Sequence, residues 1–432
     1  MPANDDARAS RAAFTHPGFT LFQIARFLIV SAVEMQAVAV GWQVYEITHR
    51  PLDLGYVGLA QFLPGILLFP ISGHASDRFE RSQVLSLCYG GYAVCFALLL
   101  ILTERGTPSI TSIYIVLVLI GVVRSFNGTA SRSILPQLVP EIHFPNAVAW
   151  NATVFQAATI LGPSFGGIVY AAFRGPSAVY VIAMITAIGA TVSSLRIKPE
   201  VKARPREPMT LKTVFAGLHF IWNKKLILGA ISLDLFAVLL GGAVALLPVY
   251  AREILHTGPW GLGLLRTAPG AGAALMAIAV AHRPLRGRSG QTLLWAVAGF
   301  GAFTIVFGLS RNLVASLIAL VLLGASDMIS VIIRATLTQL ATPDEMRGRV
   351  TAVDMIFIGT SNEFGQFESG VTAQWFGTVP AVVLGGVGTL IVIGLWAWWF
   401  PELRHAGELH KITSASLQGA SEVTADGERL PS

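Results

Sequence analysis

Long blocks of hydrophobic positions, separated by short polar joints, dominate the pattern of this chain. Positions 54–71 and 84–103 contain no ionised residue, whereas the joint between them carries two acidic and two basic residues within positions 77–81. A run of about 20 apolar residues can cross the hydrocarbon core of a bilayer as an α-helix. The pattern therefore predicts two membrane-spanning helices connected by a loop at one membrane face.

The same pattern recurs along the chain and predicts twelve spans. One long polar connection, 197–225, divides them into six plus six. We expect an N-terminal cytoplasmic segment (1–19), a six-helix bundle (20–196), this cytoplasmic linker, a second six-helix bundle (226–400) and a polar, disordered tail (401–432). The expected spans are 20–45, 53–74, 82–103, 110–132, 145–172, 176–196, 226–251, 258–281, 290–310, 313–335, 349–375 and 379–400.

Composition agrees with a membrane protein. Of the 432 residues, 53% are hydrophobic and only 12% are charged, whereas soluble domains carry about 25% charged residues. The formal charge of +6 does not indicate a nucleic-acid partner, because the basic residues lie in short loops rather than on one face of a soluble domain. Cys88 and Cys95 lie within one apolar run, so we expect reduced thiols and predict neither a disulfide nor a metal site.

Lysine and arginine are distributed unevenly over the predicted loops. With a cytoplasmic N-terminus, about 22 of the 30 lie on the cytoplasmic side, and the positive-inside rule then places both termini in the cytoplasm. Residues 1–18 are polar and the first apolar run is too long for a cleavable signal, so the first helix is expected to direct its own insertion. The basic residues of the opposite side are Arg50, Arg105, Arg174, Arg252 and Arg311.

The two halves also resemble each other. The stretch 58–65 (GLAQFLPG) recurs at 263–270 (GLLRTAPG), and Arg132 with Gln-Leu five residues later recurs at Arg334. The two offsets, 205 and 202, are nearly equal. Chance matching of glycine and proline in apolar sequence is the alternative, but two matches at nearly one offset favour a duplicated six-helix unit.

The polar joint resembles a signature of the major facilitator superfamily. It reads Gly73-x-x-x-Asp77-Arg78-x-x-Arg81, with Glu80 where that superfamily usually has glycine. The resemblance implies a gate, in which the aspartate helps to latch the cytoplasmic side. Arg132 and Arg81 are candidate partners of Asp77, and Gly73 would let its helix approach a neighbour closely. The alternative is a loop that only anchors topology through its arginines.

Two further motifs support the same resemblance. Arg124-Ser-Phe-Asn-Gly, in the fourth span, is similar to the arginine-glycine motif of the superfamily, whose arginine is implicated in proton coupling. Gly162-Pro163-Ser-Phe-Gly166-Gly167, in the fifth, resembles the motif of exporters that exchange substrate for protons; plain helix packing is the alternative for these small residues. The stretches 60–64, 135–148 and 234–242 are similar to the bacterial enterobactin-exporter-type branch.

Ionisable residues inside the spans are the candidate functional groups, because a charge at the bilayer centre costs roughly 2.5 to 3.5 kcal/mol and needs a polar cavity or a partner. Glu34 and Asp234 occupy similar places in the first helix of each half, and burial favours the protonated form of a carboxyl group. We expect both to carry protons and Arg124 to couple them; a local ion pair is the alternative for each. Asp354, near a helix end, is expected to be interfacial. Other cavity candidates are Arg26, Gln61, Arg266, Asp327, Glu363, Gln366 and Glu368.

These features together predict an all-α membrane protein with the major facilitator fold, two pseudo-symmetric six-helix bundles around a cavity that opens alternately to each side. The expected function is proton-coupled export of a small amphipathic molecule, a siderophore such as enterobactin or a drug-like compound. An importer or uniporter is the alternative within transport, and a membrane sensor or membrane enzyme is the alternative from another class. No P-loop or clustered nucleophile and base is present in the sequence. We expect no cofactor and a monomer in the bacterial inner membrane, with protons and the lipid bilayer as its other partners.

Overall fold

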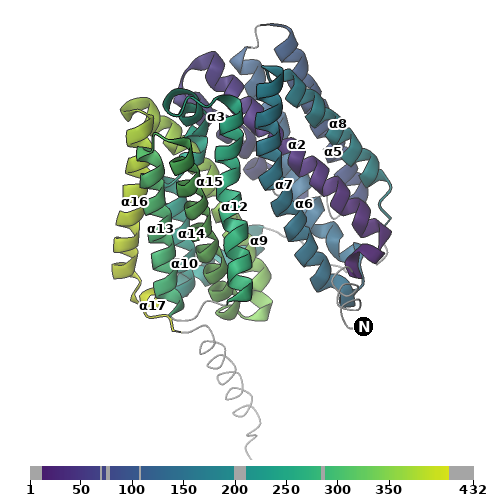
Figure 1. Ribbon diagram of the computed structural model, residues 1–432. Helices are drawn as coiled ribbons and strands as arrows, with labels where there is room; N and C mark the ends of the chain where they lie inside the picture. The colour runs from purple at the N-terminus through teal and green to yellow at the C-terminus, as the bar shows by residue number, and fades with distance from the viewer. Residues whose placement is uncertain are drawn as a thin grey trace, which may run out of the picture. The chain divides into compact units, whose positions relative to one another are not determined.

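The computed structural model describes residues 12–68, 71–73, 78–106, 109–198, 211–283 and 288–407. All regular elements of these residues are helices (Figure 1). Asp77, the centre of the predicted gate, lies outside the described residues, as do most of the predicted linker and of the tail.

The helices follow the apolar runs of the sequence. In the first half they are η1 (Ala12–Thr15), α2 (Pro17–Thr48), α3 (Pro51–Leu67), α5 (Arg81–Glu104), α6 (Ile110–Leu138), η2 (Glu141–His143), α7 (Phe144–Phe173) and α8 (Ser177–Leu195). In the second half they are α9 (Leu211–Asn223), α10 (Lys225–Leu240), η3 (Ala243–Leu246), α11 (Leu247–Val249), η4 (Tyr250–Ile254), α12 (Gly258–His282), α13 (Ser289–Leu309), α14 (Leu313–Leu340), α15 (Asp344–Phe376), α16 (Thr378–Trp399) and α17 (Pro401–Arg404).

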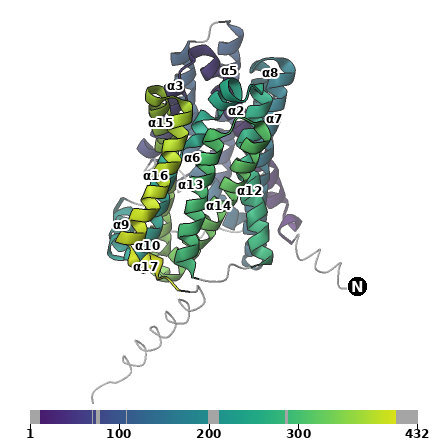
Figure 2. The same ribbon diagram turned by 60° about the vertical axis from the view of Figure 1, so that its left-hand side comes forward.

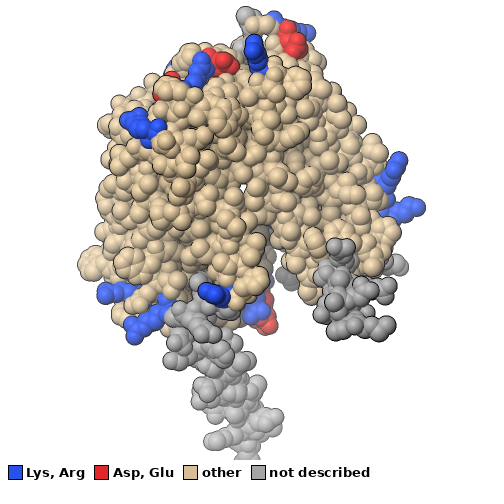
Figure 3. Space-filling model, viewed as in Figure 1, with Lys and Arg blue, Asp and Glu red and all other residues tan. Residues whose placement is uncertain are grey.

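Ten helical segments among the described residues are long and apolar enough to cross a membrane, by length and composition. Two predicted spans are not among these ten: α3, which has 17 residues, and α15, which has 33 residues but is rich in polar side chains. Together they make up the twelve helices of the predicted fold, so the all-α, membrane-spanning fold class is confirmed. On the face shown in Figure 3, charged side chains lie toward the helix ends and uncharged ones cover the stretch between.

The chain groups into two compact units. Unit 1 comprises Met1–Met209, Val244–Gly270 and Arg311–Leu313, and unit 2 comprises Thr210–Ala243, Ala271–Ser310 and Val314–Ser432. Unit 1 thus contains the helices of the first half together with the segment after α10 and the first part of α12.

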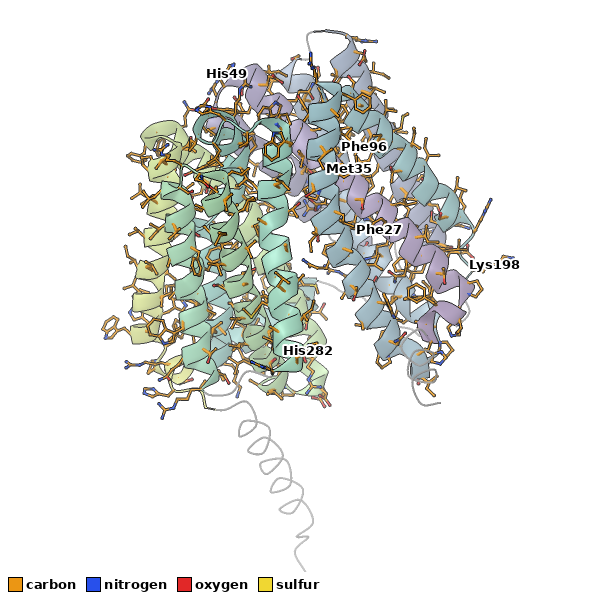
Figure 4. The ribbon with its side chains drawn as sticks, in the orientation of Figure 1. Phe27, Met35, His49, Phe96, Lys198 and His282 are labelled. Carbon is orange, nitrogen blue, oxygen red and sulfur yellow. The ribbon has the colours of Figure 1, made fainter. Side chains whose placement is uncertain are left out.

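In unit 1, α2 is the central helix. It packs against α7 and α8, while α5 packs between α8 and α6, and α3 lies on α6. Phe22 of α2 and Phe96 of α5 are fully buried in this core, and Figure 4 labels Phe96. Proline starts both α2 and α3 (Pro17 and Pro51), where a backbone N–H has no partner within the helix in any case.

Unit 1 also holds the irregular segment between α10 and α12. Tyr45, near the end of α2, donates a hydrogen bond from its hydroxyl to the Glu253 carboxylate, and the Arg252 guanidinium lies 5.9 Å from the centroid of the Trp42 ring. These contacts attach η4, a single turn of π-helix, to the C-terminal end of α2.

In unit 2, α10 packs on both α15 and α16, and α13 packs along α16 (Figure 2). A core between α10, α13, α14 and α16 contains Leu233, Leu293, Leu337 and Trp396. The amphipathic helix α9 docks on α15 through Ile221 and its neighbours. These contacts bring together the helices whose charged side chains form the site described below.

Small residues set the distance between α13 and α16. A methyl group at Gly386 would lie 2.7 Å from the carbonyl oxygen of Gly301 and 2.6 Å from Cγ1 of Ile305. Gly394, two turns further along α16, has open space at the same position. The close approach of the two helices therefore depends on Gly386.

We expect Gly386→Ala to destabilise the protein by about 1 to 3 kcal/mol, since overpacking forces the helices apart. The matched control is Gly394→Ala, which should be neutral or slightly stabilising, because alanine favours a helix over glycine by up to about 1 kcal/mol. Thermal unfolding of the purified protein in detergent measures both. Equal melting temperatures for the two variants would contradict the packing argument.

Candidate functional site

A buried arginine in unit 2 joins three helices. Arg334 of α14 donates from Nη1 to Oδ1 of Asp354 on α15 at 2.6 Å, and its Nη2 lies 3.2 Å from Oδ2 of Asp234 on α10. Arg334 and Asp234 are only 4% and 7% exposed. One guanidinium therefore bridges two carboxylates from helices that are far apart in the sequence.

A third carboxyl group belongs to the same cluster. Asp327 lies two helical turns before Arg334 on α14, so the two side chains share one face. The charged groups that act on Asp327 are Asp234 and Arg334. Within the described part of the chain, the Asp327 carboxyl makes no hydrogen bond or ion pair, in contrast to the two carboxylates that Arg334 holds.

The charges of this cluster do not balance. Two carboxylates bind one guanidinium and a third carboxyl group interacts with them electrostatically, so two excess negative charges in a low-dielectric interior would be costly if all three were ionised. Binding of a proton to one carboxyl group reduces that imbalance. The cluster of Asp234, Asp327, Arg334 and Asp354, called the Arg334 cluster below, therefore has the composition of a site that can bind and release protons.

Helix α15 carries two further acidic groups. Glu363 is 7% exposed and accepts a hydrogen bond of 3.3 Å from Nε2 of Gln366, one turn away. Glu368 accepts a hydrogen bond of 2.7 Å from the hydroxyl of Thr372. The structure thus brings Glu363 and Gln366 together and provides Glu368 with a separate partner.

In unit 1, Glu34 of α2 is the predicted proton carrier. Arg266 and Arg124 are the positive groups that act on its carboxylate. A methyl group at Gly162 of α7 would lie 2.7 Å from Cβ of Glu34, so α7 packs directly over this residue. The structure thereby brings together three of the predicted site residues, Glu34, Arg124 and Arg266.

Arg26, eight residues before Glu34, has a different environment. Its Nη1 donates to the hydroxyl of Ser131 on α6 at 2.7 Å, and its guanidinium carbon lies 5.2 Å from the centroid of the Phe155 ring on α7. Arg26 and Glu34 are too far apart along the helix axis to pair, as their spacing indicates.

The exporter-type motif occupies a packing interface. Gly166 lies against Met35 of α2, which Figure 4 labels, and Gly167 lies against Pro259 and Gly263. Pro163 is buried inside α7. These small residues let α7 touch two other segments of unit 1 backbone to backbone.

The residues of the predicted gate are only partly assembled in the described region. Arg81 donates from Nη1 to the carbonyl of Ser133 at 3.2 Å, next to the exposed Arg132, and Arg78 is exposed. The close approach expected at Gly73 is not seen, since a methyl group there would meet no described atom within 4 Å.

Gln61 is separate from the charged groups. Its Nε2 lies 3.5 Å from the carbonyl of Val57 in the same helix, while its backbone packs against Gly121 of α6. The side chain of Gln61 is therefore bound to its own helix.

The sequence argument missed Arg334 and its link to Asp354. It placed Arg334 at the end of a span, whereas α14 continues to Leu340 and the side chain is buried. The repeat that aligns Arg334 with Arg132 is the signal that could have identified it. Asp354 was expected to be interfacial, but its side chain is only 20% exposed and it is bound to Arg334.

We expect Arg334→Gln to destabilise the protein by about 3 to 5 kcal/mol, because it leaves Asp234 and Asp354 without their cation. The control is Arg347→Gln, which removes the exposed pair with Asp344 and should cost less than about 1 kcal/mol. Adding Asp234→Asn to Arg334→Gln should restore part of the loss. Thermal unfolding in detergent measures all three, and a wild-type melting temperature for Arg334→Gln would contradict the stabilising role of the cluster.

Curated relatives cover most of the chain. It is 27% identical over 388 residues to the enterobactin exporter EntS of Citrobacter koseri, with 88% of this chain and 91% of the relative covered. It is 26% identical over 398 residues to the enterobactin exporter EntS of Escherichia coli K12, with 90% and 94% covered.

Solved structures of transporters share the fold. A bacterial homolog of the human lysosomal transporter Spinster has a TM-score of 0.68 at 14% identity, covering 90% of this chain and 98% of its own. A D-xylose-proton symporter has a TM-score of 0.67 at 14% identity, with 88% and 97% covered. The family model of the Major Facilitator Superfamily matches residues 22–366. The chain therefore belongs to the major facilitator superfamily of membrane transporters.

Proposed function

We propose that this transporter exports a small amphipathic molecule in exchange for protons, by alternating access. The observation that carries the proposal is the Arg334 cluster, in which two carboxylates bind one buried arginine and a third carboxyl group, Asp327, interacts with it electrostatically inside membrane-spanning helices. Intramembrane ionisable groups of this kind mark ion and proton pathways.

Asp327 and Asp234 are the proposed proton carriers of unit 2. Asp234 and Asp354 are bound to Arg334, whereas Asp327 is not bound to it but interacts electrostatically with both Asp234 and Arg334. Protonation of either Asp234 or Asp327 changes which carboxylate Arg334 attracts most strongly. Since these groups lie on α10, α14 and α15, proton binding would change the packing of three helices at once.

Glu34 is the proposed carrier of unit 1, with Arg124 as the coupling residue. Two arginines, Arg124 and Arg266, attract the Glu34 carboxylate. Protonation of Glu34 would remove its negative charge, and the two guanidinium groups could then attract an anionic group elsewhere. Asp77, with Arg132 or Arg81, is the proposed gate of the first motif, and the gate would open and close as these charges change.

The relatives support the proposed substrate class and direction of transport. Two proteins that match this chain over about nine-tenths of its length are named enterobactin exporters. A small amphipathic molecule, either a siderophore such as enterobactin or a drug-like compound, is the proposed cargo.

The distribution of lysine and arginine supports an orientation with both termini in the cytoplasm. We place the protein in the bacterial inner membrane, acting as a monomer.

The test uses purified protein in proteoliposomes that contain a pH-sensitive dye, with a panel of siderophores and hydrophobic drugs. One compound should move protons as it crosses the membrane, and an imposed pH gradient should drive its accumulation. Asp327→Asn should reduce this accumulation to the level of protein-free liposomes, because the variant cannot release a proton. It should still exchange labelled for unlabelled compound, which needs no net proton movement.

The matched control is Asp344→Asn, which neutralises an exposed acid on α15 and should transport normally. Transport of a compound without proton movement would instead indicate a uniporter. Transport in the opposite direction along the proton gradient would indicate an importer, and tight binding without any transport would indicate a sensor.

A further inference from the structure

We propose that Arg26, Ser131 and Phe155 form a subsite in unit 1 that binds the oxyanion and the adjoining ring of a hydroxylated aromatic acid. The place of this subsite in transport rests on the proposed function, but binding itself does not. The shared chemistry is a carboxylate or phenolate attached to an aromatic ring.

The three residues come from three helices. Ser131 of α6 accepts a hydrogen bond of 2.7 Å from Nη1 of Arg26 on α2, and Phe155 of α7 lies 5.2 Å from the guanidinium carbon. These contacts hold the guanidinium in one orientation and occupy only one of its N–H groups. Nε of Arg26 is buried and makes no hydrogen bond to any described residue. The guanidinium therefore keeps N–H donors for a planar oxyanion, which it can bind through two parallel hydrogen bonds.

Arg26 has no counter-ion among the described residues. It lies nine residues after Pro17, about 13 Å along α2, and thus well inside the span. A cation inside a membrane span, with no carboxylate partner among the described residues, favours an anionic ligand.

The surroundings of Phe155 fit a hydroxylated ring. The Phe155 side chain is 43% exposed, although a guanidinium already lies over its ring. Asn151 lies one turn before Phe155, and Asn127 lies one turn before Ser131, so each shares a helix face with its neighbour. The Oδ1 atoms of both asparagines are buried without a hydrogen-bond partner in the described region. They are acceptors for the hydroxyl groups of such a ligand.

The test measures binding to the purified protein in nanodiscs, without any proton gradient, with salicylate as the probe. Salicylamide, which has the same ring and hydroxyl group but no charge, is the matched ligand. Wild type should bind salicylate more tightly than salicylamide. Arg26→Gln should weaken salicylate binding at least about tenfold, the loss expected for a charged hydrogen bond, and should leave salicylamide binding unchanged.

Two further variants keep the result interpretable. Arg26→Lys retains the charge and should restore part of the salicylate affinity, and Phe155→Leu should weaken both ligands because both lose the ring contact. The controls are Arg196→Gln and Phe173→Leu, which change an exposed arginine and an exposed phenylalanine of the same unit and should bind like wild type.

Unchanged salicylate affinity in Arg26→Gln would overturn the subsite, as would equal losses in Arg196→Gln. Displacement of salicylate by chloride or phosphate at equal concentration would also overturn it, because it would indicate a site without selectivity for an aromatic ring. The outcome of the proteoliposome assay does not depend on this binding result. That assay tests proton movement through Asp327, which lies outside unit 1, whereas the nanodisc assay tests anion binding at Arg26.

Discussion

Charge is expensive in the hydrocarbon interior, and this constraint explains the most informative contacts of the protein. Arg334 is almost completely buried, and it is tolerated there because Asp234 and Asp354 bind it from two other helices. The ion pairs join α10, α14 and α15 at one point. A change in the protonation of the cluster would act on the packing of these helices, and this is the physical argument for the proposed coupling of proton movement to a conformational change.

The two halves of the chain connect their first and fourth long helices through different polar contacts. In the first half, an arginine of the first long helix, Arg26, donates to Ser131 of the fourth. In the second half, an arginine of the fourth long helix, Arg334, binds Asp234 of the first. In both halves an arginine thus links the first and the fourth long helix. The arginine belongs to the first helix in one half and to the fourth helix in the other. Pseudo-symmetry alone does not require this difference in side chains between equivalent helices.

Close helix packing positions these charged groups. Gly162 lets α7 lie directly over Glu34, and Gly386 lets α16 approach α13. Lipid provides little driving force for the association of helices, so van der Waals contact between closely spaced backbones must stabilise it. Small residues allow this close spacing. The glycines of the exporter-type motif therefore have a demonstrable packing role in unit 1, whatever their further part in the transport cycle.

The sequence by itself determined the fold class, because apolar runs and their polar joints are local properties that set where a chain can cross a membrane. It also identified nearly all the ionisable residues inside the spans, since each one is conspicuous in an apolar run. It did not show which of them meet. Asp234 and Arg334 are far apart in the chain, and Asp354 looked interfacial from its place near a helix end. Only the tertiary structure decided that these three form one cluster and that Arg26 has a serine and a phenylalanine as partners, because such contacts depend on how separate helices pack and rotate against each other.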